Sequence, residues 1–227
     1  MCGRVAVARP LDGLAEYFAA RVVPALLESW EPSWNVAPTR PLVGLFETGG
    51  GERVLQAFTW GLRGRLFNAR SETVTMSAAF RDAVRSRRLA VPVDGFYEWA
   101  GEGHRRRPRF FRRADGDPLV LAGLWERNPD GALTCTILTT ASGPDVAAVH
   151  DREPVVLGAD VLDRWLHHSP LRQSEVDALC RPSAAGTLTS HPVDRRVGDV
   201  RNDSPDLVQP VPDGADPPDP EPLTLFG

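Results

Sequence analysis

The chain has 227 residues, a formal net charge of −4 and 42% hydrophobic residues, a size and composition that suit one domain with a sizeable core. No apolar run approaches the ~20 residues needed to span a bilayer, and the first 30 residues lack a basic stretch followed by an apolar one, so we expect a cytoplasmic protein without a membrane segment. The three cysteines, Cys2, Cys135 and Cys180, are an odd number without CxxC spacing, which argues against a disulfide framework and a zinc site.

Charge is distributed unevenly along the chain. Residues 1–113 contain 18 arginines and 11 acidic residues, whereas residues 114–227 contain 8 arginines and 19 acidic residues. The amino-terminal half is therefore suited to face a polyanion. From Pro210 onward the sequence is rich in Pro and Asp and has no apolar periodicity, so we expect a domain over 1–209 and an acidic disordered tail over 210–227.

The first part of the chain alternates strand-like and helical patterns. Residues 5–8 alternate as in a short strand, and residues 11–22 carry apolar residues at helical spacing, with Asp12 as the expected N-cap. The runs PLVGLFET and RVLQAFTWGL flank three glycines at 49–51, which predicts a hairpin.

A basic region follows this hairpin. Helical spacing over 78–88 places Arg81, Arg85 and Arg88 on one face, which is either a solvated face or a phosphate track. After a strand-like segment over 89–99, HRRRPRFFRR interleaves arginine with phenylalanine, as grooves for single-stranded nucleic acid do. The same alternation also fits an ordinary sheet with one wet face.

The second half contains the clearest strands, followed by helical patterns. The expected strands span 118–126 and 133–140, and the expected helices span 159–168 and 174–180. Cys135 falls inside the second strand as a core residue, and His167 and His168 suit a helix C-terminus. The sequence has no internal repeat, P-loop, GxGxxG or HExxH motif, so it offers no residues for nucleotide-binding or metalloprotease chemistry.

The amino terminus carries a distinctive pair of groups. If the initiator Met1 is removed, Cys2 presents its thiol and the α-amine together, as a 1,2-aminothiol. An aldehyde condenses with such an amine to a Schiff base, and the thiol then closes a thiazolidine ring. All 26 basic residues are arginine, so the α-amine is the only primary amine, and at pKa about 7.7–8.0 roughly a quarter to a third of it is free base near pH 7.4. The other interpretation is that Cys2 is a small, partly buried hydrophobe.

Eight ordered blocks between residue 2 and about residue 209 together resemble the SOS-response-associated peptidase (SRAP) family, whose members process abasic sites in single-stranded DNA: MCGR, WNVAPT, WGL, NARSET, VPVDGFYEW, AGLWE, ILTTA and VHDREPVVL. The resemblance implies an α+β fold in which mixed and antiparallel sheets form a barrel-like core flanked by helices, as a single domain. It implies no metal or organic cofactor. It further implies a nucleoid-associated monomer of the DNA damage response whose amino-terminal cysteine crosslinks to the aldehyde of an abasic site and shields the lesion.

The resemblance also implies roles for individual residues. Cys2 is the nucleophile, Glu98 the acid/base group and His150 a second proton-transfer group. Asn35 orients the sugar or the amino terminus by hydrogen bonds, or acts only as a turn former. DNA contacts are expected from the following side chains: Arg4, Trp60, Arg70, Arg85, Arg88, Trp99 and Arg106. Two alternatives are an Arg70–Glu72 ion pair and a core hydrogen bond for His150.

Three features stand apart from the family pattern. Glu153 replaces the usual Met three residues after His150, where it either alters the local pKa or faces solvent. The segment between WGL and NARSET is short, only RGRLF. At the end of the chain, Leu223, Thr224, Leu225 and Phe226 resemble the short peptide with which bacterial proteins bind the sliding clamp, although its Gln is missing.

Two other functions compete with abasic-site crosslinking. A cysteine peptidase would use Cys2, Glu98 and His150 for acyl transfer, and the family also suggests lyase-type activity with slow or absent turnover. A non-covalent single-stranded DNA-binding module would use the arginine and aromatic surface without any lesion preference.

Overall fold

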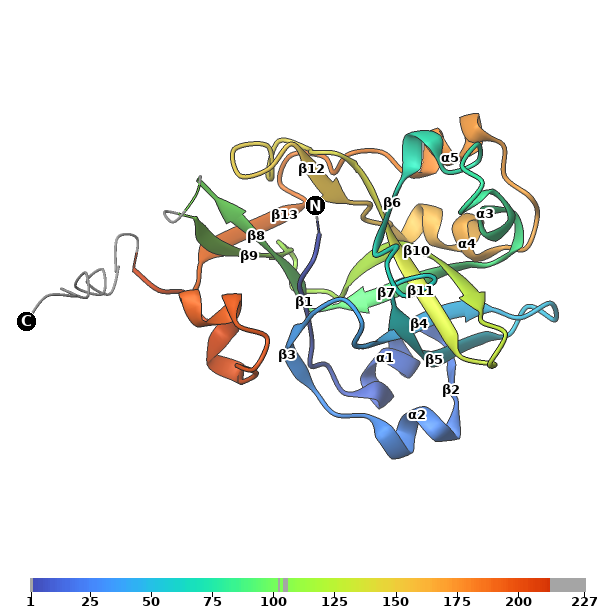
Figure 1. Cartoon of the computed structure of the whole chain (residues 1–227), viewed down its shortest axis with the longest axis horizontal. Helices are drawn as coiled ribbons and strands as arrows, with labels where there is room; N and C mark the ends of the chain where they lie inside the picture. The colour runs from blue at the N-terminus through green and yellow to red at the C-terminus, as the bar shows by residue number, and fades with distance from the viewer. Residues whose placement is uncertain (1, 102, 104–105, 213–227) are drawn as a thin grey trace, which may run out of the picture.

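The structure is a computed structural model that describes residues 2–101, 103 and 106–212, and it is built on two β-sheets (Figure 1). The smaller sheet has the strand order β13–β9–β8–β1–β3, and all neighbours are antiparallel. Its strands are β1 (Val5–Val7), β3 (Ser33–Val36), β8 (Gly95–Ala100), β9 (Arg107–Arg113) and β13 (Leu188–Pro192).

The larger sheet runs β12–β11–β10–β7–β4–β5–β2, and β6 pairs with β11. Its strands are β2 (Arg21–Val22), β4 (Pro41–Glu47), β5 (Arg53–Trp60), β6 (Asn68–Arg70), β7 (Arg88–Val93), β10 (Leu119–Arg127), β11 (Leu133–Ala141) and β12 (Arg152–Pro154). A parallel pairing of β11 with β5 at Thr134↔Thr59 and Cys135↔Trp60 curls this sheet back on itself without closing a strict barrel. The expected α+β fold with a barrel-like core is therefore confirmed.

The strands follow the predicted runs closely. β4 and β5 pair in unbroken register from Pro41↔Thr59 to Glu47↔Arg53, so the hairpin around the three glycines is confirmed. β10 and β11 form an antiparallel pair, and Cys135 is fully buried as expected. The 89–99 segment divides at Asp94 into β7 and β8, which belong to different sheets. The chain therefore passes from the larger sheet to the smaller sheet at Asp94, which connects the two sheets.

Helices flank the sheets. The α-helices of the described residues are α1 (Leu11–Phe18), α2 (Pro24–Ser29), α3 (Arg81–Ser86), α4 (Ala159–Leu166) and α5 (Gln173–Leu179). Asp12 is not the N-cap of α1: the helix begins after Pro10, whose ring fixes a φ suited to a helix start, and Asp12 lies in the first turn. The chain leaves α1 at Ala19 in the left-handed conformation and enters β2.

The smaller sheet has two differently used faces because successive side chains of a strand point to opposite sides. Phe96 and Phe111 stack in the main core together with side chains of the larger sheet, and we call this the inner face. Tyr97 and Phe110 point the other way and pack under residues 193–208, which we call the arm; this side is the arm face. The arm contains the short 3-10 helices η3 (Arg195–Gly198) and η4 (Pro205–Val208), coloured orange-red in Figure 1.

Backbone hydrogen bonds to the domain continue two residues past residue 209, its expected end. The backbone N–H of Val211 donates to the carbonyl of Pro192 at the end of β13, with a distance of 3.0 Å. Residues 213–227, which include the clamp-like segment 223–226, lie outside the described residues. Within the part of the chain that is described, none of the helices has the length and apolarity required to span a bilayer.

Candidate functional site

Cys2 and Glu98 are neighbours on the inner face of the smaller sheet. The pairing Val5↔Phe96 and a 2.9 Å hydrogen bond from the Tyr97 N–H to the Arg4 carbonyl align the start of the chain with β8. Both side chains are buried, with 0% and 2% exposure. Burial, and then the negative charge of Glu98, raise the pKa of the Cys2 thiol, so the sulfur is protonated at neutral pH.

Asn35 and Arg4 lie on the arm face, on the other side of β1 from Cys2. Oδ1 of Asn35 accepts a 2.6 Å hydrogen bond from Arg4, which also donates to the carbonyl of Val197. The amide of Asn35 donates to the carbonyls of Asp199 and Asn202 at 3.1 and 2.6 Å. Asn35 is 4% exposed, and its side chain binds both the arm and Arg4, two residues from Cys2. The expected sugar contact of Asn35 and phosphate contact of Arg4 stay predictions, since in this structure both groups bind the arm.

Both tryptophans predicted to touch DNA are used inside the protein. Trp60 is fully buried, and its indole N–H donates to the carbonyl of Phe67 at 2.9 Å. Trp99 packs against the core under the arm, with the guanidinium carbon of Arg4 5.9 Å from its ring centroid. The prediction of a DNA contact is therefore wrong for Trp60, which cannot reach solvent, and the ring of Trp99 already has a partner.

Arg88 joins two helix ends instead of extending a phosphate track. α3 ends at Ser86, so Arg88 belongs to β7, and its guanidinium turns into the interior with 3% exposure. Helix C-terminal carbonyls carry partial negative charge, which a buried cation neutralises. Burial, and then the nearby Arg164, lower the pKa of Arg88 to about 10, so it remains charged at neutral pH. The guanidinium donates to the carbonyls of Val84, Arg85, Trp165, His167 and Ser169.

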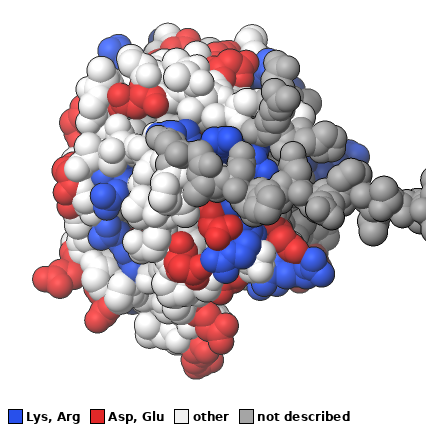
Figure 2. Space-filling model, turned by 90° about the vertical axis from the view of Figure 1, so that its left-hand side faces the viewer, with Lys and Arg blue, Asp and Glu red and all other residues white. Residues whose placement is uncertain are grey.

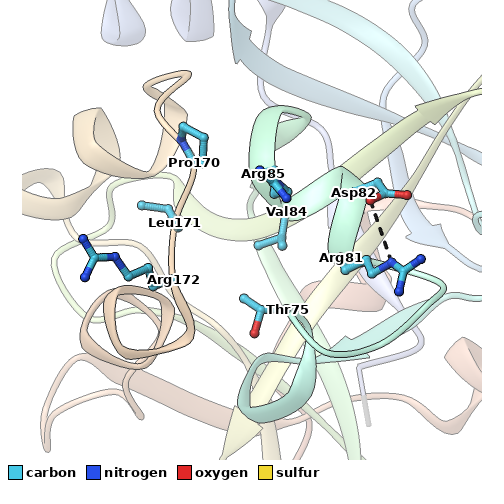
Figure 3. Close-up of a pocket in the computed structure, with 8 residues that line it drawn as sticks. All are labelled: Thr75, Arg81, Asp82, Val84, Arg85, Pro170, Leu171 and Arg172. Carbon is cyan, nitrogen blue, oxygen red and sulfur yellow. Dashed lines mark ion pairs between the residues drawn. The ribbon is translucent and has the colours of Figure 1, made fainter.

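Three of the predicted DNA-contacting arginines, Arg70, Arg85 and Arg106, are exposed. Arg85 lines a cavity of about 640 Å³ between α3 and the 170–172 segment (Figure 3). Arg81, at the edge of this cavity, lies 3.9 Å from Asp82, and in Figure 3 its side chain points away from that of Arg172. The arginines around this cavity therefore do not converge on a single bound anion.

A polar cluster forms where β6, β11 and β12 meet. Arg152 makes a bidentate ion pair with Glu72, both contacts at 3.0 Å, and donates to the carbonyl of Thr139 at 2.7 Å. Glu72 is thus hydrogen-bonded to Arg152, and Arg70 on the adjacent strand stays exposed. Alternation along β6 places Asn68 on the face of Arg70. Neither Arg152 nor Asn68 is among the predicted site residues, although both lie inside the blocks VHDREPVVL and NARSET.

His150 ends the loop that precedes β12. Its Nδ1 accepts a 2.9 Å hydrogen bond from the Arg152 N–H, so the neutral ring carries its proton on Nε2. Oδ1 of the exposed Asp151 also lies 2.9 Å from Nδ1 and becomes an acceptor when the ring is protonated. The ring is 22% exposed and therefore accessible as a proton donor.

On the face drawn in Figure 2, the unequal charge of the two halves of the sequence gives no uniformly basic surface. Figure 2 shows arginines adjoining acidic side chains on the face it displays. Several ion pairs connect the basic half to the acidic half, including Arg53–Asp163 and Arg63–Glu126. Among the described residues, no group of three or more His, Cys, Asp or Glu side chains is arranged to hold a metal ion.

The fold and this site define a class: an α+β protein with a curled sheet and a cysteine at position 2 that is buried beside a carboxylate. Residues 1–200 match the family model described as SOS response associated peptidase (SRAP), and the chain belongs to this family.

Similar proteins include the abasic site processing protein YedK of Escherichia coli K12, which is 32% identical over 226 residues covering 93% of this chain and 100% of YedK. Abasic site processing protein YoqW of Bacillus subtilis 168 is 29% identical, covering 92% of this chain and 99% of YoqW. The abasic site processing protein HMCES of Gallus gallus is 28% identical, covering 80% of this chain and 67% of HMCES.

Solved structures share the fold. A protein from Bacteroides thetaiotaomicron has a TM-score of 0.81 at 20% identity, with 92% of this chain and 100% of that chain covered. A protein from Bordetella bronchiseptica has a TM-score of 0.72 at 25% identity, with 85% and 100% covered.

Proposed function

We propose that this chain captures abasic sites in single-stranded DNA by forming a thiazolidine with Cys2 after removal of Met1. The observation that carries the proposal is the position of Cys2, which is buried beside Glu98 three residues before β1, a strand held in register by β8. Family membership and relatives named abasic site processing proteins support the choice of substrate.

The reaction is a condensation that loses one water. The α-amine of Cys2 attacks the aldehyde carbon of the opened sugar, and expulsion of water gives a Schiff base. The sulfur then adds to the same carbon, and the thiol proton ends on the ring nitrogen, so no oxidant or reductant is involved. Because burial and Glu98 raise the thiol pKa, ring closure needs a base at the sulfur. We assign that role to Glu98, the charged side chain that acts on the thiol.

His150 and the exposed arginines complete the proposed site. The Nε2–H of His150 faces the hydroxyl that leaves as water: the protonated ring transfers its Nε2 proton to that oxygen while its Nδ1–H donates to Asp151, and the ring is left neutral with Nδ1 accepting from the Arg152 N–H. Arg70, Arg85 and Arg106 contact phosphates, because they are the exposed members of the predicted set.

A peptidase function, suggested by the family's description, would need Cys2 as a thiolate. The raised pKa of the buried thiol counts against it. An extra residue placed before Cys2 separates the two functions, because an internal thiol still attacks peptides but has no free amine with which to form a thiazolidine.

The test mixes the purified protein with a single-stranded oligonucleotide that contains one abasic site, next to an intact oligonucleotide, followed by a denaturing gel and intact mass measurement. We expect a band that survives denaturation and has the summed mass of both partners less one water. Cys2→Ala and the variant extended before Cys2 should give no such band. Absence of an adduct from protein verified to begin at Cys2 would overturn the proposal, and unchanged DNA binding by Cys2→Ala without lesion preference would favour a non-covalent binding module.

A further inference from the structure

Glu153 is a buried carboxylate that the proposed chemistry does not use. Its side chain is fully buried, and each carboxylate oxygen accepts one backbone N–H. Oε2 accepts from Gly143 at 2.9 Å, and Oε1 accepts from Ser183 at 2.6 Å. Although it lies three residues from His150 in sequence, Glu153 does not face solvent, and both of its oxygens bind backbone N–H groups of other segments. It links two loops that are 40 residues apart.

A series of backbone hydrogen bonds leads from this carboxylate to His150. Gly143, whose N–H binds Glu153, accepts from the Val146 N–H at 3.1 Å. The carbonyl of Val146 in turn accepts from the His150 N–H at 3.1 Å. Val146 itself is fully buried in the main core, so the loop is fixed along its length. Loss of the first contact would therefore loosen the backbone that carries the imidazole.

The contact between the two loops leaves no spare room. A Cβ on Gly143 would lie 2.2 Å from the carbonyl oxygen of Ser183, so only glycine allows this approach. Glu153 satisfies the two N–H groups that the close approach would otherwise bury without partners. Glu153 and Gly143 therefore both maintain the close contact between the backbone at Gly143 and the backbone at Ser183, which we call the junction.

We propose that Glu153 is a positioning residue that, by binding Gly143 and Ser183, holds the 142–151 loop so that His150 is placed for proton transfer. This inference rests on the proposed function, in which His150 donates a proton. It assigns Glu153 no contact with DNA.

The first test compares crosslinking rates of wild type, Glu153→Gln, His150→Ala and the double variant over a range of abasic-site DNA concentrations. An amide places an NH₂ group against one of the two backbone N–H groups, so it breaks one contact with almost no change of shape. We expect the rate at saturating DNA to fall about tenfold or more, as for a displaced catalytic group, with an unchanged half-saturating concentration. The double variant should be no slower than His150→Ala.

Asp194→Asn is the matched control, because the Asp194 carboxylate also accepts a backbone N–H, from Arg196 at 2.8 Å, but in the arm. It should react at the wild-type rate. Gly143→Ala forces the same junction apart and should reproduce the Glu153→Gln defect, which keeps the test available if one variant is poorly folded. A wild-type rate for Glu153→Gln at saturating DNA, or independent losses in the double variant, would overturn the proposal.

Amide hydrogen exchange measured without DNA separates this inference from the proposed function. Glu153→Gln should increase exchange across 143–150 and leave the arm unchanged. If wild type forms no crosslink but the exchange increases, the proposed function fails and the positioning of the loop stands. Unchanged exchange across 143–150 would refute the positioning itself.

Discussion

Replacement of Arg88 by alanine tests whether this arginine serves folding or DNA. The guanidinium is buried and donates to five carbonyls at the ends of α3 and α4. Hydrogen bonds to a charged group contribute about 1.5–3 kcal/mol each, and contacts within one network do not add. We therefore expect Arg88→Ala to lower the free energy of unfolding by about 3–5 kcal/mol, at the upper end for single substitutions. For a protein of this size that corresponds to a decrease in Tm of roughly 6–20 °C.

Thermal unfolding followed by circular dichroism measures this loss. Arg85→Ala is the control, because Arg85 is exposed and its replacement should change stability by no more than about 0.5 kcal/mol. Arg88→Lys should fall between the two, since an ammonium has three donors for five carbonyls. In DNA binding, Arg85→Ala should have the larger effect. It should reduce the slope of log affinity against log salt concentration by about one unit, and Arg88→Ala should leave this slope unchanged. A Tm for Arg88→Ala equal to that of Arg85→Ala would refute the reasoning.

Three further predictions concern charge and the arm. Glu98→Gln should lower the pKa of the Cys2 thiol, so that the pH dependence of its alkylation moves to lower pH; an upward movement would contradict the assigned electrostatics. Asn35→Ala should cost about 1–3 kcal/mol by leaving buried partners unsatisfied and should increase proteolysis of the arm, whereas unchanged cleavage would argue against its role there. Hydrogen bonds from Arg201 lower the pKa of Asp199 to about 2. The stabilisation of the folded state by this ion pair is therefore complete above about pH 4 and is lost as the pH falls towards 2. When Tm is measured against pH, it should fall less steeply below pH 4 in Asp199→Asn and at high salt.

Much of the fold follows from local patterns, but the allocation of residues to faces does not. The β4–β5 hairpin is predicted by two strand-like runs around three glycines, because both signals act within a few residues. β1 is only three residues long and is buried on both faces, so its sequence contains no alternation that identifies the inner face. The family resemblance groups Arg4 and Asn35 with Cys2, whereas in the structure both side chains bind the arm and Cys2 packs in the main core.

The same limit applies to the basic cluster after α3. Helical spacing groups Arg88 with Arg81 and Arg85 only if the helix continues, but it ends at Ser86. The guanidinium then binds carbonyls of a helix some 75 residues later in the chain. Composition counts Arg88 only as one more basic residue. The tertiary structure shows that its guanidinium is hydrogen-bonded to backbone carbonyls at the ends of α3 and α4.

The position of Asn35 explains how the start of the chain, a region that ordinarily frays, is held in place. Asn35 binds Arg4, two residues from Cys2, to the arm, so β1 is fixed from the side opposite the thiol. Glu153 binds the loop of His150 in a comparable way, through the backbone N–H groups of Gly143 and Ser183. In both cases a buried polar side chain satisfies backbone groups of a distant segment and does not itself meet the substrate. Because the amine and the sulfur belong to one residue, these supports would act on the proposed reaction by fixing Cys2 and His150 relative to the aldehyde carbon.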